Sequence, residues 1–233
     1  MEKCLLSIDW DYFIYSSKYY WGYYSENKKN LIDLWYKRYI QGKARGEDIQ
    51  KAFHLSYEFY TFWSKIKKKF KFVKDIRVYV SDSHTMSYEI AHQNNCKTVY
   101  LFDFHADLGY GGFLSLDAEV NCSNWLGKLL KERLINKAVI FYSPHTIEKP
   151  EYFQSLNRIY NIRYYDFDNF NQCVVVAAIH ICRSGTWTPP WFDDKFIQFI
   201  DGLGLSYEIV ECPERKWDTA GISLSDQINY LLA

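Results

Sequence analysis

The sequence lacks several features that would assign the protein to a well-known class. It contains no C-x-x-C pair, signal peptide, transmembrane run or lipidation motif, and its 28 lysines and arginines balance its 28 aspartates and glutamates. A neutral chain gives no reason to expect nucleic acid or a membrane as a partner. Its six cysteines are predicted to be reduced core thiols, which argues against a disulfide framework and a cysteine zinc site. We therefore expect a cytoplasmic protein.

The length and composition favour one folding unit. The chain has 233 residues, of which 48% are hydrophobic and 24% are charged, so it can bury one large core. No repeat, low-complexity tract or linker divides it. We predict a single domain over residues 1–233, and the sequence leaves open whether copies of it form a homo-oligomer.

Strand-like and helix-like segments alternate along most of the chain. Short apolar runs predict strands, and apolar residues spaced three or four apart predict helices. This alternation predicts an α/β fold with three layers, α/β/α, around a mostly parallel sheet. The expected strands are 3–9, 76–82, 98–104, 137–143, 162–167, 174–182 and 206–211. The expected helices are 29–41, 47–70, 87–93, 124–135, 150–160, 190–202 and a short one from Ser225.

One stretch carries the strongest chemical signal. The apolar run that begins at Thr98 ends in Asp103, His105 and Asp107. Alternate side chains of a strand point to one face, so these three start from the same side, although Asp107 already approaches the following turn. Carboxylates and an imidazole at the mouth of a buried strand are costly to leave unpaired. A bound metal ion is the simplest partner for them.

Two other apolar runs end in the same kinds of residue. The first strand leads to Asp9 and Asp11, and the strand over 76–82 leads to His84. Parallel strands deliver such side chains to the carboxyl edge of a sheet, where we expect them to meet. Four carboxylates and two imidazoles suit two hard or borderline divalent ions, and manganese is the best candidate. The predicted metal ligands are Asp9, Asp11, His84, Asp103, His105 and Asp107.

A pair of divalent ions points to a class of reaction. Such ions typically lie about 3.5–4 Å apart, with a water molecule between them whose pKa they lower. Hydroxide then forms near neutral pH and attacks an electrophilic carbon bound beside it. The sequence therefore predicts metal-assisted hydrolysis.

The three motifs together resemble those of the ureohydrolase superfamily, the arginases and agmatinases. Members carry Gly-Gly-Asp-His, Asp-Ala-His-x-Asp and Ser-x-Asp-x-Asp at three strand ends around two manganese ions. The matching segments here are 81–84, 103–107 and 7–11. The resemblance implies an arginase/deacetylase-like fold. It also implies that His84 and Asp107 hold one ion, His105 and Asp11 the other, that Asp103 and Asp9 bridge them, and that Asp82 orients a ligand.

The chain departs from the usual ureohydrolase pattern in two ways. Its Ser-x-Asp-x-Asp strand comes first rather than late, and the chain is shorter than most free-arginine enzymes. Both features are more similar to a divergent branch that includes the peptide arginases, which convert arginine to ornithine within ribosomally made peptides. We therefore expect a peptide arginase that releases urea. Residues 121–125 lack the histidine that shuttles protons in arginases, so His145 or His180 is the candidate replacement, beside Asp107 in the catalytic set.

A guanidinium substrate needs a carboxylate to grip its planar N–H fork. The resemblance favours Glu47 or Glu58 over Glu89 and Glu119, because arginases use a glutamate that follows the Ser-x-Asp-x-Asp strand. Arg183 is a further candidate, for a carboxylate or carbonyl of the substrate. The aromatic loop over residues 12–27 leaves directly from the predicted ligands. It is either a packing loop or a wall of the substrate site.

Other functions remain open from the sequence. The substrate could be free arginine or agmatine. A deacetylase of the same broad fold would use one zinc ion with an Asp-His-Asp set, and a non-catalytic binding protein would keep the metal for stability. Metal stoichiometry and turnover on guanidine substrates separate these alternatives.

Overall fold

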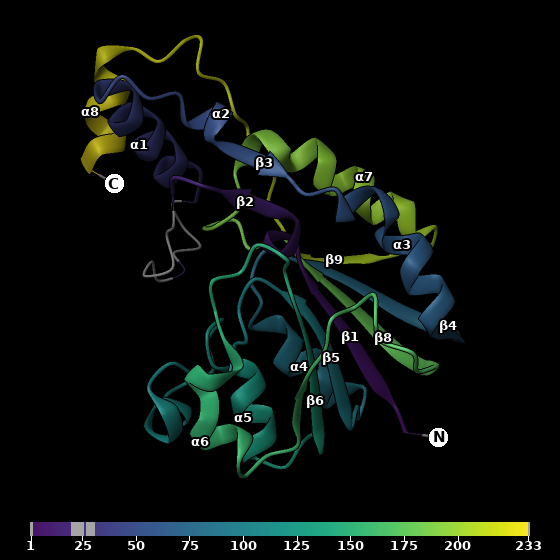
Figure 1. Cartoon of the computed structure of the whole chain (residues 1–233). Coiled ribbons are helices and arrows are strands. Elements are labelled where there is room, and N and C mark those ends of the chain that lie inside the picture. The colour runs from purple at the N-terminus through teal and green to yellow at the C-terminus, as the bar shows by residue number, and fades with distance from the viewer. Residues whose placement is uncertain (1, 20–25, 27–30, 233) are drawn as a thin grey trace.

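The computed structural model describes residues 2–19, 26 and 31–232 of the chain. Its centre is a seven-stranded sheet with the order β7-β6-β5-β1-β8-β4-β9, in which each neighbouring pair is parallel (Figure 1). The strands are β1 (Cys4–Asp9), β4 (Phe70–Ser81), β5 (Thr98–Asp103), β6 (Lys137–Tyr142), β7 (Ile162–Tyr164), β8 (Val174–Cys182) and β9 (Glu208–Glu211).

Helices cover both faces of this sheet, which confirms the predicted three-layer α/β/α fold (Figure 1). All residues of β1 and β5 are buried, as expected for parallel strands covered on both sides. One face packs against α3 (Glu58–Lys69) and α7 (Asp193–Leu203). The other face packs against α4 (Met86–Gln93), α5 (Trp125–Lys131) and α6 (Gln154–Asn157).

The alternation along β1 separates the two cores. Leu6 and Ile8 point into the layer of α3 and α7, whereas Leu5 points into the layer of α4 and α5. Ser7 and Asp9 share the face of Leu5, because side chains two apart in a strand point the same way. The polar end of β1 therefore lies on the α4 side of the sheet.

The helix expected over residues 47–70 is wrong as one element. The segment forms α2 (Ile49–Ala52), a short strand β3 (Phe53–Leu55) and then α3. β3 pairs antiparallel with β2 (Ile14–Ser16), outside the main sheet. The apolar spacing fits a helix, but Phe53 is buried in the core while His54 is exposed, which is the alternation of a strand.

The position of β4 also differs from the expectation. It begins at Phe70 rather than at residue 76, and β8 lies between it and β1, so the three motif strands are not side by side. Only β1 and β5 are direct neighbours among them. The order of the strands in a sheet is set by the helices and loops that connect them. The local periodicity of the sequence does not predict that order.

The remaining elements connect or flank these layers. The C-terminal helix α8 (Leu224–Leu232) packs against α1 (Leu31–Ala44), with Tyr36 stacked on Tyr230 at a ring separation of 4.4 Å. Among the described helices, none is both long and apolar enough to cross a membrane.

The expected helix over 150–160 is shorter than predicted. The 3₁₀ helices are η1 (Trp10–Phe13), η2 (Gly112–Leu116), η3 (Pro150–Phe153) and η4 (Pro190–Phe192).

Candidate metal centre

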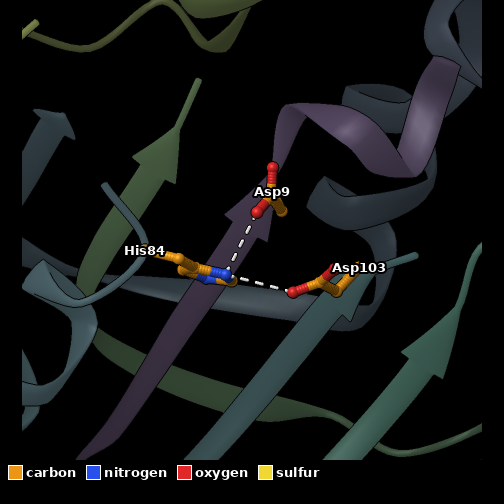
Figure 2. A group of neighbouring side chains, drawn as sticks. All are labelled: Asp9, His84 and Asp103. Atoms are coloured by element: carbon orange, nitrogen blue, oxygen red, sulfur yellow. Dashed lines mark ion pairs between the residues drawn. The ribbon is translucent and has the colours of Figure 1, made fainter. Parts of the chain in front are cut away.

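The predicted ligands converge at the carboxyl edge of the sheet. Figure 2 shows Asp9 and Asp103, at the ends of β1 and β5, turned toward the ring of His84. His84 follows β4 and reaches this point across the end of β8. All three residues are buried, with at most 3% of their surface exposed.

His84 faces three carboxylates at once. Its Nδ1 atom lies 3.1 Å from Asp9 Oδ2, 3.0 Å from Asp103 Oδ2 and 2.9 Å from Asp107 Oδ2. A single N–H can point at only one of them, and His84 Nδ1 and Asp103 Oδ2 make no hydrogen bond of good geometry within the described residues. Ligands about 2.1 Å from an octahedral ion, on neighbouring axes, lie about 3 Å apart. The observed spacing therefore fits a shared cation better than a network of hydrogen bonds.

A second group adjoins the first. His105 Nδ1 lies 3.1 Å from Asp11 Oδ2 and 3.6 Å from Asp103 Oδ1. Asp103 thus turns one oxygen to His84 and the other to His105. The ligand atoms of each group, Asp9 with His84 and Asp103, and Asp11 with Asp103 and His105, lie within 4.8 Å of one another.

Main-chain N–H groups hold these carboxylates in place. Asp9 caps η1 by accepting a hydrogen bond from the N–H of Asp11 at 3.1 Å. Asp11 in turn accepts from the N–H of Phe104 at 3.1 Å, and Asp103 accepts from the N–H of His105 at 2.7 Å. These hydrogen bonds to the predicted ligands hold the loop after β5 against the first turn after β1. Because β5 ends at Asp103, this loop rather than strand alternation positions His105 and Asp107.

Two residues at the cluster adopt left-handed backbone conformations. Asp107 has a φ of 50° and Ser184 has a φ of 49°. Trp125 Nε1–H donates to Asp107 Oδ2 at 2.6 Å, and the Ser184 hydroxyl donates to Asp9 Oδ2. Such conformations cost of order 1–3 kcal/mol and persist where surrounding contacts enforce them. The strain lies at the two points where the chain must aim a side chain at the cluster.

A chain of buried polar side chains supports His84 from behind. Ser7 Oγ lies 2.8 Å from His84 Nε2 and 2.7 Å from Ser87 Oγ. Ser87 Oγ lies 2.6 Å from His180 Nδ1, and His180 Nε2 lies 2.8 Å from Ser81 Oγ. All five side chains are at most 1% exposed.

Ser81 lies at the end of this series of hydrogen bonds farthest from His84, and its own hydrogen bond determines which group donates at each step. The Ser81 hydroxyl donates to the main-chain carbonyl two residues on at 2.8 Å, so it accepts from His180 Nε2–H. Nδ1 of His180 then carries no proton and accepts from Ser87. Ser87 accepts from Ser7, which leaves Ser7 to accept from His84 Nε2–H. Neutral His84 therefore turns a bare Nδ1 lone pair toward three carboxylates, an arrangement that calls for a cation.

The pKa shifts express the same crowding. Burial lowers the pKa of His84, but its contacts with Asp103, Asp107 and Asp9 outweigh this and raise the pKa well above its usual value. Burial and the charges of neighbouring aspartates raise the pKa of Asp103 well above its usual value. Burial also opposes charge on His105, yet Asp103 and Asp11 raise its pKa. The crowded carboxylates therefore favour positive charge at this point, which protons or a bound cation can supply.

The two candidate proton shuttles lie in different surroundings. His145 is half-buried, stacks on Tyr15 with ring centroids 3.8 Å apart, and lines a cavity of about 460 Å³ together with Asp11 and His105. His180 is completely buried within the serine chain, and burial lowers its pKa well below the usual value. His180 is thus separated from the cluster by Ser87 and Ser7.

The candidate substrate residues do not line this cavity. Glu47 pairs with Lys18 Nζ at 2.7 Å, and hydrogen bonds from Lys18 and Tyr19 lower its pKa to about 2. Glu58 accepts from Ser56 and lines a separate cavity beside Lys65. Glu89 and Glu119 are exposed. The Arg183 guanidinium is buried against Asp82, Asp193 and the Pro213 carbonyl. Asp82, which was expected to orient a metal ligand, therefore pairs with Arg183 instead.

Sequence reasoning overlooked several residues near the cluster. Ser7 shares a strand face with Asp9, a signal that the period-2 pattern contained. Glu26 has its Oε2 atom 2.7 Å from Ser83 Oγ, next to His84 in the chain, and no local pattern marks it. Glu148 accepts from the Ala106 N–H at 3.0 Å and from Tyr110. In the aromatic loop expected over 12–27, residues 12–13 belong to η1 and 14–16 to β2, and residues 20–25 and 27 lie outside the described residues.

Comparison with known proteins adds no family. The chain matches no protein-family model, no curated protein and no solved structure. The argument for a function therefore comes from the residues of this site alone.

Proposed function

We propose that this protein is a binuclear metallohydrolase that cleaves the guanidinium group of an arginine side chain, within a peptide, to give ornithine and urea. The observation that supports it best is the sharing of Asp103 between the His84 group and the His105 group. A carboxylate that offers one oxygen to each of two neighbouring clusters is suited to bridging two ions. The proposed ions are Mn²⁺, held by Asp9, Asp11, His84, Asp103, His105 and Asp107.

The metal pair has a defined chemical contribution. When bound, two divalent ions lower the pKa of a water molecule between them and stabilise charge that develops during its attack. The overall reaction adds the water oxygen to the guanidinium carbon and breaks the bond from that carbon to Nε. Urea leaves, and Nε takes up a proton to become the ornithine amine.

The protein must grip the guanidinium and supply that proton. Glu26 is the proposed acceptor for the N–H fork, because it stands beside the loop that carries His84. His145 is the proposed donor to Nε, because it lines the same cavity as His105 and is within reach of solvent.

Turnover assays on defined guanidines test the proposal. The manganese-loaded protein is incubated with free arginine, agmatine and an arginine peptide, and urea is measured together with peptide mass. We expect urea and a mass loss of about 42 Da per modified arginine, the formula difference between arginine and ornithine. His105→Ala is the inactive control.

The competing functions give different results. Turnover restricted to free arginine or agmatine contradicts a peptide substrate. One zinc ion per chain and activity on acetylated amines indicate a deacetylase of similar fold. Bound metal without turnover of any guanidine indicates a metal-stabilised binding protein.

A further inference from the structure

The ribbon formed by β2 and β3 has a defined hydrogen-bonding register. Tyr15 pairs with His54, and Ile14 pairs with Leu55. The Ser56 N–H donates to the Phe13 carbonyl at 2.7 Å. Hydrogen-bonded and non-hydrogen-bonded pairs alternate along antiparallel strands, so the Tyr15–His54 pair carries the next bonds between the two strands.

This register turns the main chain of Ile14 and Ser16 away from β3. The Ile14 N–H confirms the direction, because it donates to the Asp11 carbonyl instead of to β3. β2 has no other neighbouring strand in the described part of the chain. The Ser16 N–H and the Ile14 carbonyl make no hydrogen bond to any described residue. These two groups form a short free strand edge.

The free edge borders the cavity of the candidate metal centre. Ile14 and Ser16 line this cavity, and so do Asp11 and His105 of the ligand cluster. In Figure 1, β2 lies between β3 and the loops at the carboxyl edge of the sheet. Asp11 is also only three residues before Ile14, so a strand on this edge would run directly past the cluster.

We propose that the substrate peptide binds in an extended conformation as a third strand on the free edge of β2, with one arginine side chain directed at the metal centre. This inference rests on the proposed function and adds how that site recognises its substrate. An added strand gains affinity from main-chain hydrogen bonds and selectivity from alternate side-chain pockets. A free amino acid has no neighbouring peptide groups to make those bonds.

Charge complementarity supports a peptide that carries a cationic side chain. Asp11 lines the cavity, and the buried carboxylates of Asp9, Asp103 and Asp107 belong to the same cluster, so acidic groups face the end of the cavity that a cationic side chain would enter.

Aromatic side chains fit the rest of an extended peptide. Tyr15 stacked on His145 forms one wall, and Tyr19 stacked on Phe53 forms another, with ring centroids 6.0 Å apart. Alternate residues of a strand point to opposite sides, so residues flanking the arginine would contact these walls rather than the metal centre.

Backbone methylation of the peptide tests the proposal without altering the protein. Each amide of a short peptide with a single arginine is N-methylated in turn, and kcat/KM for urea release is compared with that of free arginine. Loss of one hydrogen bond plus the added methyl group is expected to lower kcat/KM roughly tenfold. We expect this loss only at the amide whose N–H donates to the Ile14 carbonyl. Equal effects at all positions, or none, overturn the proposal.

A substitution in β2 provides the matching test on the protein. Ser16→Pro removes the outward N–H, which β3 does not use, and Ser16→Ala keeps it. The peptide-to-arginine ratio of kcat/KM should fall roughly tenfold in Ser16→Pro and stay near the wild-type ratio in Ser16→Ala. An unchanged ratio in Ser16→Pro, with normal metal content, overturns the proposal.

Two controls keep this inference separate from the proposed function. If no guanidine is hydrolysed, binding of the fluorescent methylated peptides to the manganese-loaded protein is measured by anisotropy. Weaker binding of the peptide methylated at that one amide, and of no other, then supports the strand edge while the proposed reaction fails. If the wild type forms a dimer that Ser16→Pro dissociates, a second copy occupies the edge and the peptide proposal is wrong.

Discussion

Replacing Ser7 by alanine tests whether its hydroxyl group holds the His84 ring in the orientation that binds a metal ion. In Ser7→Ala, the Nε2–H of His84 loses its acceptor at a site that is 1% exposed. An unsatisfied buried donor costs about 1–3 kcal/mol, and loss of a partner behind a metal-binding histidine typically weakens metal affinity 10–100-fold. We therefore expect the Kd for Mn²⁺ to rise at least tenfold in this variant.

The same change has a calculable effect on stability. At a free Mn²⁺ concentration 100 times the wild-type Kd, binding stabilises the fold by about 2.7 kcal/mol, and a tenfold weaker Kd reduces this to about 1.4 kcal/mol. Calorimetric Mn²⁺ titration gives the Kd, and thermal unfolding with and without Mn²⁺ gives the stabilisation. The increase in unfolding free energy that Mn²⁺ causes should therefore be about half as large in Ser7→Ala as in the wild type.

Position along the serine chain supplies the controls. Ser87→Ala breaks the chain one step farther from His84, so its effect on Mn²⁺ affinity should be smaller than that of Ser7→Ala. Ser64→Ala removes an exposed hydroxyl on α3 and should leave the affinity unchanged. A Kd for Ser7→Ala within about twofold of the wild type would refute the reasoning, because a partner that orients a ligand cannot be lost at so small a cost.

Three further predictions concern single residues. Burial lowers the pKa of His180, so the unfolded chain binds a proton below about pH 6.5 that the folded state excludes. The stability that depends on neutral His180 is therefore present above that pH and is lost as the pH falls, by up to about 1.4 kcal/mol per unit. Urea unfolding measured from pH 7 to 5 gives the free energy of unfolding at each pH. This free energy should fall less steeply with decreasing pH in His180→Gln than in the wild type. Asp103→Asn should abolish binding of at least one ion and all urea release, as measured by metal analysis and assay. Glu26→Gln should lower kcat/KM for arginine substrates about 10–100-fold without changing metal content, since it weakens a charge-assisted contact.

Much of the sheet follows from local sequence patterns. β1 and β5 are unbroken apolar runs that end in aspartate, and both lie where the runs predict, since burial on both faces requires such runs. The meeting of Asp9 with Asp103 also follows, because parallel neighbours end at one edge. The reach of His84 across β8 does not follow, since strand order is set by crossovers.

Tertiary contacts place two of the candidate substrate residues away from the cluster. Glu58 was expected near the substrate on the basis of its place in the chain, but the break at β3 turns it toward Lys65 and a different cavity. Arg183 was a candidate for substrate binding, but Asp82 lies 101 residues away in sequence and pairs with it. Periodicity predicts which face a residue occupies and says nothing about such distant partners.

Metal content measured on the purified protein decides whether the cluster is the binuclear centre proposed here. After reconstitution with Mn²⁺ and removal of free metal, elemental analysis of the wild type should give two ions per chain, and Asp103→Asn should hold fewer. A folded wild-type protein that retains one ion or none under these conditions would contradict the proposal, because a single ion leaves either the His84 group or the His105 group without the cation that its geometry calls for.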